Sequence, residues 1–117
     1  MNRIIIEAIP PAHARLPCYQ AQGAGDWFTD GDTLHIRVVA PEMDDEALAV
    51  AVHEAIEARL CASAGIAQAA VDTFDAGFTG SGEPGSAPDC PYREPHRAAM
   101  LVERAARYVL GLPDGGE

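Results

Sequence analysis

The segment HEAIE places a histidine and two glutamates inside a stretch that is otherwise rich in Ala, Val, Ile and Leu. His53 and Glu57 are four residues apart, so on a helix of about 3.6 residues per turn their side chains lie on the same face. Imidazole nitrogens and carboxylate oxygens are both common zinc ligands in catalytic sites. The surrounding aliphatic residues indicate burial, and a buried carboxylate needs a partner. This HExxE motif therefore predicts a metal site; the alternative is a solvent-exposed His–Glu pair that stabilises a helix.

Glu54 follows the first predicted ligand and lies about 100° further round the helix. Two ligands one turn apart, with a carboxylate beside the first, resemble the metal-binding helix of the zincin metallopeptidases. The resemblance covers five residues and departs at the second ligand, where this chain has Glu57 instead of histidine. It implies that Glu54 is the general base of a hydrolase and acts on a metal-bound water. Zinc is the expected metal, and the glutamate ligand shifts the preference toward Mn²⁺ or Fe²⁺.

A third ligand is expected from outside this helix, and the chain has three other histidines. His96 follows Pro95 in the first turn of the last predicted helix. The helix N-terminus disfavours a protonated imidazole, so His96 should be neutral and free to bind a metal. His13 and His35 are expected at the surface. We therefore predict that His96 completes the site, and a surface histidine in a first helical turn is the alternative.

Two aspartates and a glutamate are weaker candidates. Asp72 and Asp75 are three residues apart, so they share a face of a short predicted helix. Asp75 is the better candidate for a further metal ligand, because it is closer to the loop that leads to His96. A hydrogen-bond partner of a ligand and a solvated acidic face are the alternatives for this pair. Glu103 either orients His96 or, in the favoured interpretation, pairs with Arg107 at the surface.

The elements that would position these residues follow from the patterning of the chain. A β-branched run predicts a strand, the Asp30-Gly31 dipeptide predicts a hairpin turn, and alternation after it places Leu34, Ile36 and Val38 on one face. The expected elements are a strand at 3–9, a hairpin at 26–40, a long helix at about 44–64, a short helix at 66–77, a flexible loop at about 77–93, a helix at 94–111 and a frayed tail at 112–117.

Strands followed by helices predict an α+β fold. We expect a single domain over 1–117, with a small N-terminal antiparallel sheet packed on the long helix, the short helix and the C-terminal helix. On the long helix, an aliphatic stripe is expected to face the core. It consists of Leu48, Val52, Ile56 and Leu60.

Composition narrows the class of protein. The net charge of −10, from 18 acidic and 8 basic residues, argues against nucleic acid as a partner. Three cysteines without CxxC spacing indicate reduced thiols in a cytoplasm, and Cys61 is expected to be a small buried residue rather than a ligand. The first apolar run is too short for a signal peptide or a membrane span.

Several blocks of the chain together resemble a group of small proteins encoded by tailed bacteriophages and prophages. The blocks are GDWFTDGDTLHIRV, HEAIEARLC, GIAQAAVDTFDAGF, GEPGSAPDCPY and the histidine before RAAMLVER. The resemblance covers roughly residues 1 to 108. It implies a phage origin and a bacterial host cytoplasm, and it implies no activity.

Three functional hypotheses remain open at the level of sequence. The preferred one is a mononuclear metal-dependent hydrolase, with a peptide or amide substrate by analogy to the zincin helix. The second is a non-enzymatic, metal-stabilised module that binds a host or phage protein. The third is a metal-free domain whose polar residues form a hydrogen-bonded cluster.

Overall fold

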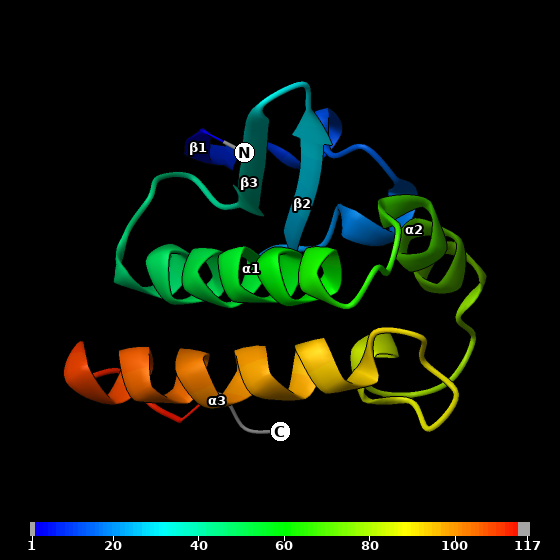
Figure 1. Cartoon of the computed structure of the whole chain (residues 1–117). Helices are drawn as coiled ribbons and strands as arrows, with labels where there is room; N and C mark the ends of the chain where they lie inside the picture. Colours follow the sequence, from blue (N-terminus) through cyan, green and yellow to red (C-terminus); the bar gives the residue numbers. More distant parts are fainter. Residues whose placement is uncertain (1, 115–117) are drawn as a thin grey trace.

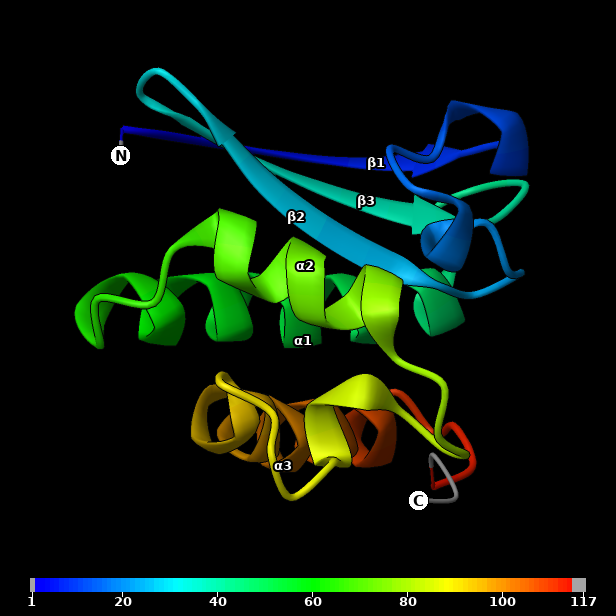
Figure 2. The ribbon, with the colours of Figure 1, turned by 90° about the vertical axis from the view of Figure 1, so that its right-hand side faces the viewer.

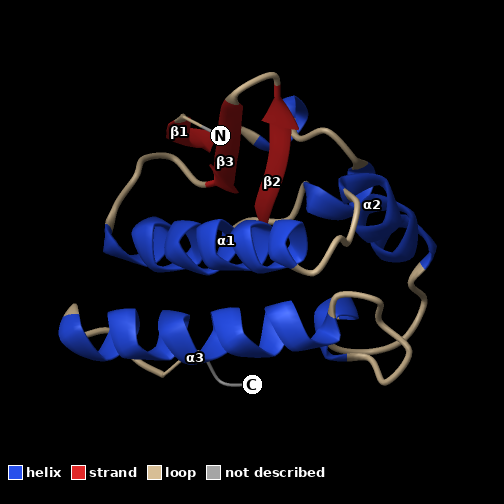
Figure 3. Cartoon of the chain, in the orientation of Figure 1, coloured by secondary structure: helices blue, strands red, loops and turns tan. Residues whose placement is uncertain are grey.

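The structure is a computed structural model that describes residues 2–114. Within them, three strands and three α-helices form an α+β fold, as expected (Figures 1 and 3). The strands are β1 (Arg3–Ile9), β2 (Gly25–Asp30) and β3 (Thr33–Val39), and the α-helices are α1 (Asp45–Ser63), α2 (Gln68–Gly77) and α3 (Arg93–Val109). Three short 3-10 helices lie in the connections: η1 (Pro11–His13), η2 (Pro17–Tyr19) and η3 (Pro84–Ser86).

The long helix α1 lies between two layers. The sheet covers one side of α1, α3 covers the opposite side, and α2 flanks the layers (Figures 1 and 2). Helices α1 and α3 are antiparallel, since Glu46 near the start of α1 bonds Arg107 near the end of α3, whereas Glu57 bonds His96 at the start of α3. None of the helices in the described part of the chain combines the length and the apolar character needed to cross a membrane.

The sheet is mixed, with the strand order β1-β3-β2. β2 and β3 form the predicted antiparallel hairpin, and Gly31 in its turn takes a φ of 57° that suits glycine. β1 pairs with β3 in parallel, so the expectation of an antiparallel sheet is wrong for this strand. The connection over residues 10–24 carries the chain across to the far edge of the sheet. β3 rather than β2 therefore becomes the neighbour of β1.

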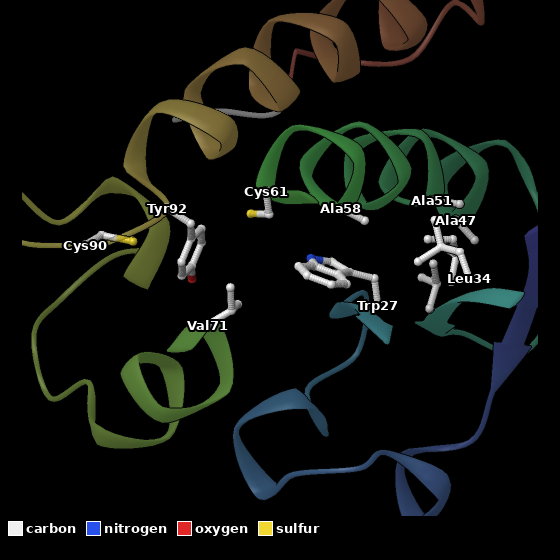
Figure 4. Packing of buried hydrophobic residues seen from close by; sticks show 11 residues of the cluster. Trp27, Leu34, Ala47, Ala51, Ala58, Cys61, Val71, Cys90 and Tyr92 are labelled. Atoms are coloured by element: carbon white, nitrogen blue, oxygen red, sulfur yellow. The ribbon is translucent and has the colours of Figure 1, made fainter. Parts of the chain in front are cut away.

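The core lies between β2, β3 and α1. Leu34, Ile36 and Val38 are fully buried, which confirms the predicted alternation. Against them α1 presents small residues at helical spacing, namely Ala47, Ala51, Ala58 and Cys61 (Figure 4). Because these side chains are small, the helix axis can approach the sheet closely.

The predicted core stripe of α1 is wrong. Leu48 and Leu60 are 38% and 36% exposed, and Val52 and Ile56 are only half-buried. The helix is packed on two sides, and alanines occupy both contacts: Ala51 faces the sheet cluster, and Ala49 is also fully buried. The small residues of α1 let the neighbouring layers approach closely, and the larger side chains of the predicted stripe are left partly exposed.

The predicted helix boundaries agree with the structure. Asp44 caps α1, because its side chain accepts a hydrogen bond from the Ala47 amide at 2.9 Å. Of the predicted tail, Leu112 and Pro113 are bonded to Arg107, and residues 115–117 lie outside the described residues. The connection between α2 and α3 contains η3 and buries Tyr92.

Candidate metal centre

Three of the predicted metal ligands meet between α1 and α3. His53 and Glu57 come from one face of α1, and His96 comes from the first turn of α3. All three residues are buried, with 5–6% of their surface exposed. One possible ligand atom from each lies within 4.8 Å of the other two. This group could hold a metal ion, as the HExxE spacing and the position of His96 predict.

Oxygen Oε2 of Glu57 lies between the two imidazoles. It is 3.3 Å from Nε2 of His53 and 3.0 Å from Nδ1 of His96. In a tetrahedral zinc site with bonds of about 2.0 Å, neighbouring ligand atoms are about 3.3 Å apart. The same three atoms can therefore share protons in hydrogen bonds or, after some adjustment of the side chains, ligate one metal.

In each histidine, one ring nitrogen faces Glu57 and the other ring nitrogen faces a further carboxylate. Nδ1 of His53 lies 3.0 Å from Oε1 of Glu103, and Nε2 of His96 lies 2.9 Å from Oε2 of Glu83. These are ion-pair distances, although neither contact has the in-line geometry of a good hydrogen bond. Metal-binding histidines characteristically present the second nitrogen to a carboxylate, which fixes the tautomer and raises ligand basicity. The arrangement is that of two carboxylate–histidine pairs converging on one point.

The second oxygen of Glu57 is also held. Nε1 of Trp27 in β2 donates to Oε1 of Glu57 at 3.2 Å. Trp27 is itself buried, so the carboxylate is fixed in orientation from the sheet side. Oε2 is thereby left to face the two histidines.

Without a metal, the centre holds protons. Burial lowers the pKa of His53, but Glu103 and Glu57 outweigh it and raise that pKa to about 10. Burial likewise opposes Glu57 and Glu83, which raise the pKa of His96 to about 9. Burial alone would raise the pKa of Glu57, but its bonds to both imidazoles lower it to about 2.

The expectation that His96 is neutral is therefore wrong for the metal-free protein. Burial of the ring lowers the pKa of His96, and the carboxylates of Glu57 and Glu83 in contact with it outweigh that effect. A bound metal would have to displace these protons, as metals generally do from their ligands.

Glu54 occupies a position that faces the sheet. It continues the spacing of Ala51 and Ala58, and it fits there because β2 has Gly25 opposite: a Cβ on Gly25 would lie 2.7 Å from Cγ of Glu54. Its Oε2 is 3.9 Å from Nε2 of His53. Burial and repulsion from Glu57 raise its pKa well above the usual value. Glu54 thus lies beside the ligands and outside the group of three.

A cavity of about 260 Å³ opens onto the centre. Its lining includes all three candidate ligands, Glu54 and the η3 segment. Gly85 in η3 is buried against His96, and a Cβ there would overlap the imidazole ring. The connection before α3 thus brings Glu83 to the centre while its glycine leaves room for the ring.

Asp75 lines the same cavity but stands apart from the three ligands. Its carboxylate accepts hydrogen bonds from the hydroxyls of Tyr19, at 2.6 Å, and Tyr92. Asp72 instead accepts a bidentate pair of hydrogen bonds from Arg15. The same guanidinium also donates two hydrogen bonds to Asp26. Both aspartates therefore tie α2 to the neighbouring connections.

The other predicted residues are accounted for individually. His13 is exposed, and His35 stacks on Phe28 on the sheet, so neither reaches the centre. The expected Glu103–Arg107 pair is wrong, because Glu103 faces His53 and Arg107 bonds Glu46. Cys61 is fully buried, as expected.

Four residues of the centre were not predicted from the sequence: Trp27, Glu83, Gly25 and Gly85. The glycines carry no signal by themselves, since each is needed only to admit a side chain from another element. Glu83 had one available signal, the acidic residue within the loop that leads directly to His96.

Comparison of the chain with protein-family models, with curated proteins and with solved structures found no match. The resemblances to phage proteins and to the zincin helix therefore stay predictions.

Proposed function

We propose that this protein is a metal-dependent hydrolase in which His53, Glu57 and His96 hold a single divalent metal, with zinc as the expected ion. One observation supports the proposal most directly. Each histidine directs one ring nitrogen at Glu57 and the other ring nitrogen at a separate carboxylate. A buried hydrogen-bonded cluster requires only that its members find partners. It does not require two histidines to direct one nitrogen each at the same carboxylate oxygen.

The ligand count favours catalysis over a structural role. Structural zinc sites are closed by four protein ligands, whereas catalytic sites have three and leave a position for water or substrate. Three side chains make up the candidate group among the described residues, and the cavity of about 260 Å³ reaches them. Asp75, the nearest alternative as a fourth ligand, is already engaged by two tyrosine hydroxyls.

Glu54 is suited to the general base. A metal of this kind lowers the pKa of a bound water toward neutrality. Glu54 lies beside His53 at the cavity, where it can take a proton without occupying a ligand position. Burial and repulsion from Glu57 raise the pKa of Glu54 well above its usual value, so its carboxylate binds a proton more tightly than an ordinary glutamate does. A peptide or amide substrate is proposed by analogy to the zincin helix alone.

The test is hydrolysis by zinc-loaded protein of a quenched fluorescent peptide library and of chromogenic amides. We expect activity that a chelator removes and added zinc restores. Glu54→Gln should keep its zinc and lose about a hundred- to ten-thousand-fold in rate, the usual contribution of a general base. Glu42→Gln, at an exposed position, is the matched control. Zinc-loaded protein with no hydrolytic activity, or a fully active Glu54→Gln variant, would favour the non-enzymatic binding module.

A further inference from the structure

Within residues 2–114, strand β1 is an open edge of the sheet with an apolar face. It is the outer strand of the sheet, next to β3 and away from β2 (Figure 1). Ile4 and Ile6 pair in parallel register with Leu34 and Ile36, so their side chains lie on the core side of the sheet. Leu34 and Ile36 are fully buried, but Ile4 and Ile6 are 52% and 44% exposed. An unprotected edge of this kind is a template for pairing with another strand.

The backbone of β1 is oriented for such pairing. The Arg3 amide donates to Asp32 at 3.3 Å, and the Ile9 carbonyl accepts from the Ala40 amide at 3.2 Å. Odd-numbered residues of β1 thus direct their N–H and C=O groups at β3. Because the groups alternate along a strand, those of Ile4 and Ile6 point to the open edge.

We propose that two copies of this chain pair through β1 as an antiparallel homodimer with its two-fold axis at Ile5. In this register Ile4 lies opposite Ile6 of the partner subunit, and each pair exchanges two backbone hydrogen bonds. The two three-stranded sheets become one sheet of six strands. A two-fold interface must be self-complementary, and the β1 segment from Arg3 to Glu7 meets this requirement.

The charges of β1 select this register. The segment reads Arg-Ile-Ile-Ile-Glu from Arg3 to Glu7, so a two-fold axis at Ile5 places Arg3 opposite the partner's Glu7, twice by symmetry. Opposite charges facing each other across antiparallel strands stabilise the pairing. An axis at Ile4 places Arg3 opposite an isoleucine, and an axis at Ile6 places Glu7 opposite one. The open-edge amides allow all three registers, and only the central one pairs the charges.

Glu7 remains available for the contact. It lies 3.6 Å from the Arg37 guanidinium, and its side chain is 44% exposed. The partner's Arg3 would approach from the opposite side, so that one carboxylate would lie between two arginines. This interface is on the outer strand and uses none of the residues of the metal centre.

The test is sedimentation equilibrium of the full chain over micromolar to millimolar concentrations. Wild-type protein should fit a monomer–dimer equilibrium. Arg3→Glu and Glu7→Arg should each weaken dimerisation by about tenfold or more, because both facing pairs become repulsive. An equimolar mixture of the two variants should form a heterodimer, since in both facing pairs a carboxylate of one variant then meets a guanidinium of the other. Arg59→Glu, at an exposed position of α1, is the matched control and should leave dimerisation unchanged.

Two results would overturn the proposal. One is wild-type protein that remains monomeric at millimolar concentration. The other is a dimer that both single variants form as readily as wild type, which would place the interface elsewhere. Far-ultraviolet circular dichroism of each variant establishes that it is folded, and recovery in the mixture separates lost pairing from lost folding.

Discussion

At the scale of single residues, the centre depends on groups that do not touch the metal position. Glu103 and Glu83 each face the outer nitrogen of a histidine, and Trp27 holds the outer oxygen of Glu57. These contacts fix which atom of each ligand points inward. A cluster of free side chains would have to lose that rotational freedom when a metal binds, whereas this one has already lost it.

Substitution of the more buried of these two carboxylates should have the larger effect on metal binding. Side-chain exposure is 16% for Glu103 and 50% for Glu83. Loss of such a partner typically costs about ten- to a hundredfold in metal affinity. We expect Glu103→Gln to weaken zinc binding in this range and Glu83→Gln to weaken it less, as measured by competition with a chromophoric chelator. Equal affinity for Glu103→Gln and wild type would mean that Glu103 does not position His53.

At the scale of elements, α1 lies so close to β2 that only a glycine opposite leaves room for Glu54. Gly25 lies opposite, and a Cβ at this position would lie 2.7 Å from Cγ of Glu54 and from Cγ1 of Val50. Overpacking of this kind typically costs about 1–3 kcal/mol. Gly25→Ala should therefore lower the free energy of unfolding by that amount in urea titrations and displace Glu54.

Gly77 provides the matched control for this substitution. It ends α2, its φ is not positive, and a methyl group added there would meet no atom within 4 Å apart from its chain neighbours and the backbone of its own helix. Gly77→Ala should leave stability unchanged or raise it slightly, because alanine loses less backbone entropy in a helix. If both variants unfold at the same urea concentration as wild type, the gap between α1 and β2 is wider than the structure has it.

The elements themselves were largely predictable from local signals. The start of the long helix at about residue 44, the Asp30-Gly31 turn and the alternation of Leu34 with its neighbours are each set over a few residues, and each was predicted correctly. The stripe through Leu48 misled because periodicity reports one buried face, and α1 has two. The parallel partner of β1 could not be predicted, since strand pairing depends on the path of the connection between strands.

In the candidate site, too, local spacing predicted some of the residues and not others. His53, Glu54 and Glu57 share one helix, so their spacing alone places them together. His96 was found by elimination among four histidines, and the structure brings it to the other two ligands. Asp75 does not join the group of three in the structure, and proximity in sequence to the loop does not reveal the two tyrosines that bind it.

At the scale of the whole molecule, metal binding and folding stability should respond to pH in opposite directions. In the metal-free protein His53 and His96 have pKa values of about 10 and 9, both above the usual 6.5. Their protonation therefore stabilises the fold fully below about pH 6.5, and the contribution is lost as pH rises through 9 and 10. Metal affinity should rise over the same interval, because fewer protons must be displaced.

Urea unfolding in the presence of a chelator measures this dependence between pH 6.5 and 8.5. The free energy of unfolding should fall by up to about 1.4 kcal/mol per pH unit for each histidine. A His53→Gln and His96→Gln double variant should have a flatter profile. A metal-free protein whose stability rises with pH in this interval would show that the imidazoles are not protonated in the fold.

The most direct test of the metal centre is to measure the metal content of the protein. The protein is purified without a histidine tag, incubated with zinc and then freed of unbound zinc. Mass spectrometry of the digested protein should find about one equivalent of zinc per chain, as a single site of this kind holds. His53→Ala, Glu57→Ala and His96→Ala should each reduce it to background, and His35→Ala should leave it unchanged. Folded wild-type protein that retains no zinc after this treatment would contradict the account, because the three side chains would then be a proton-sharing cluster alone.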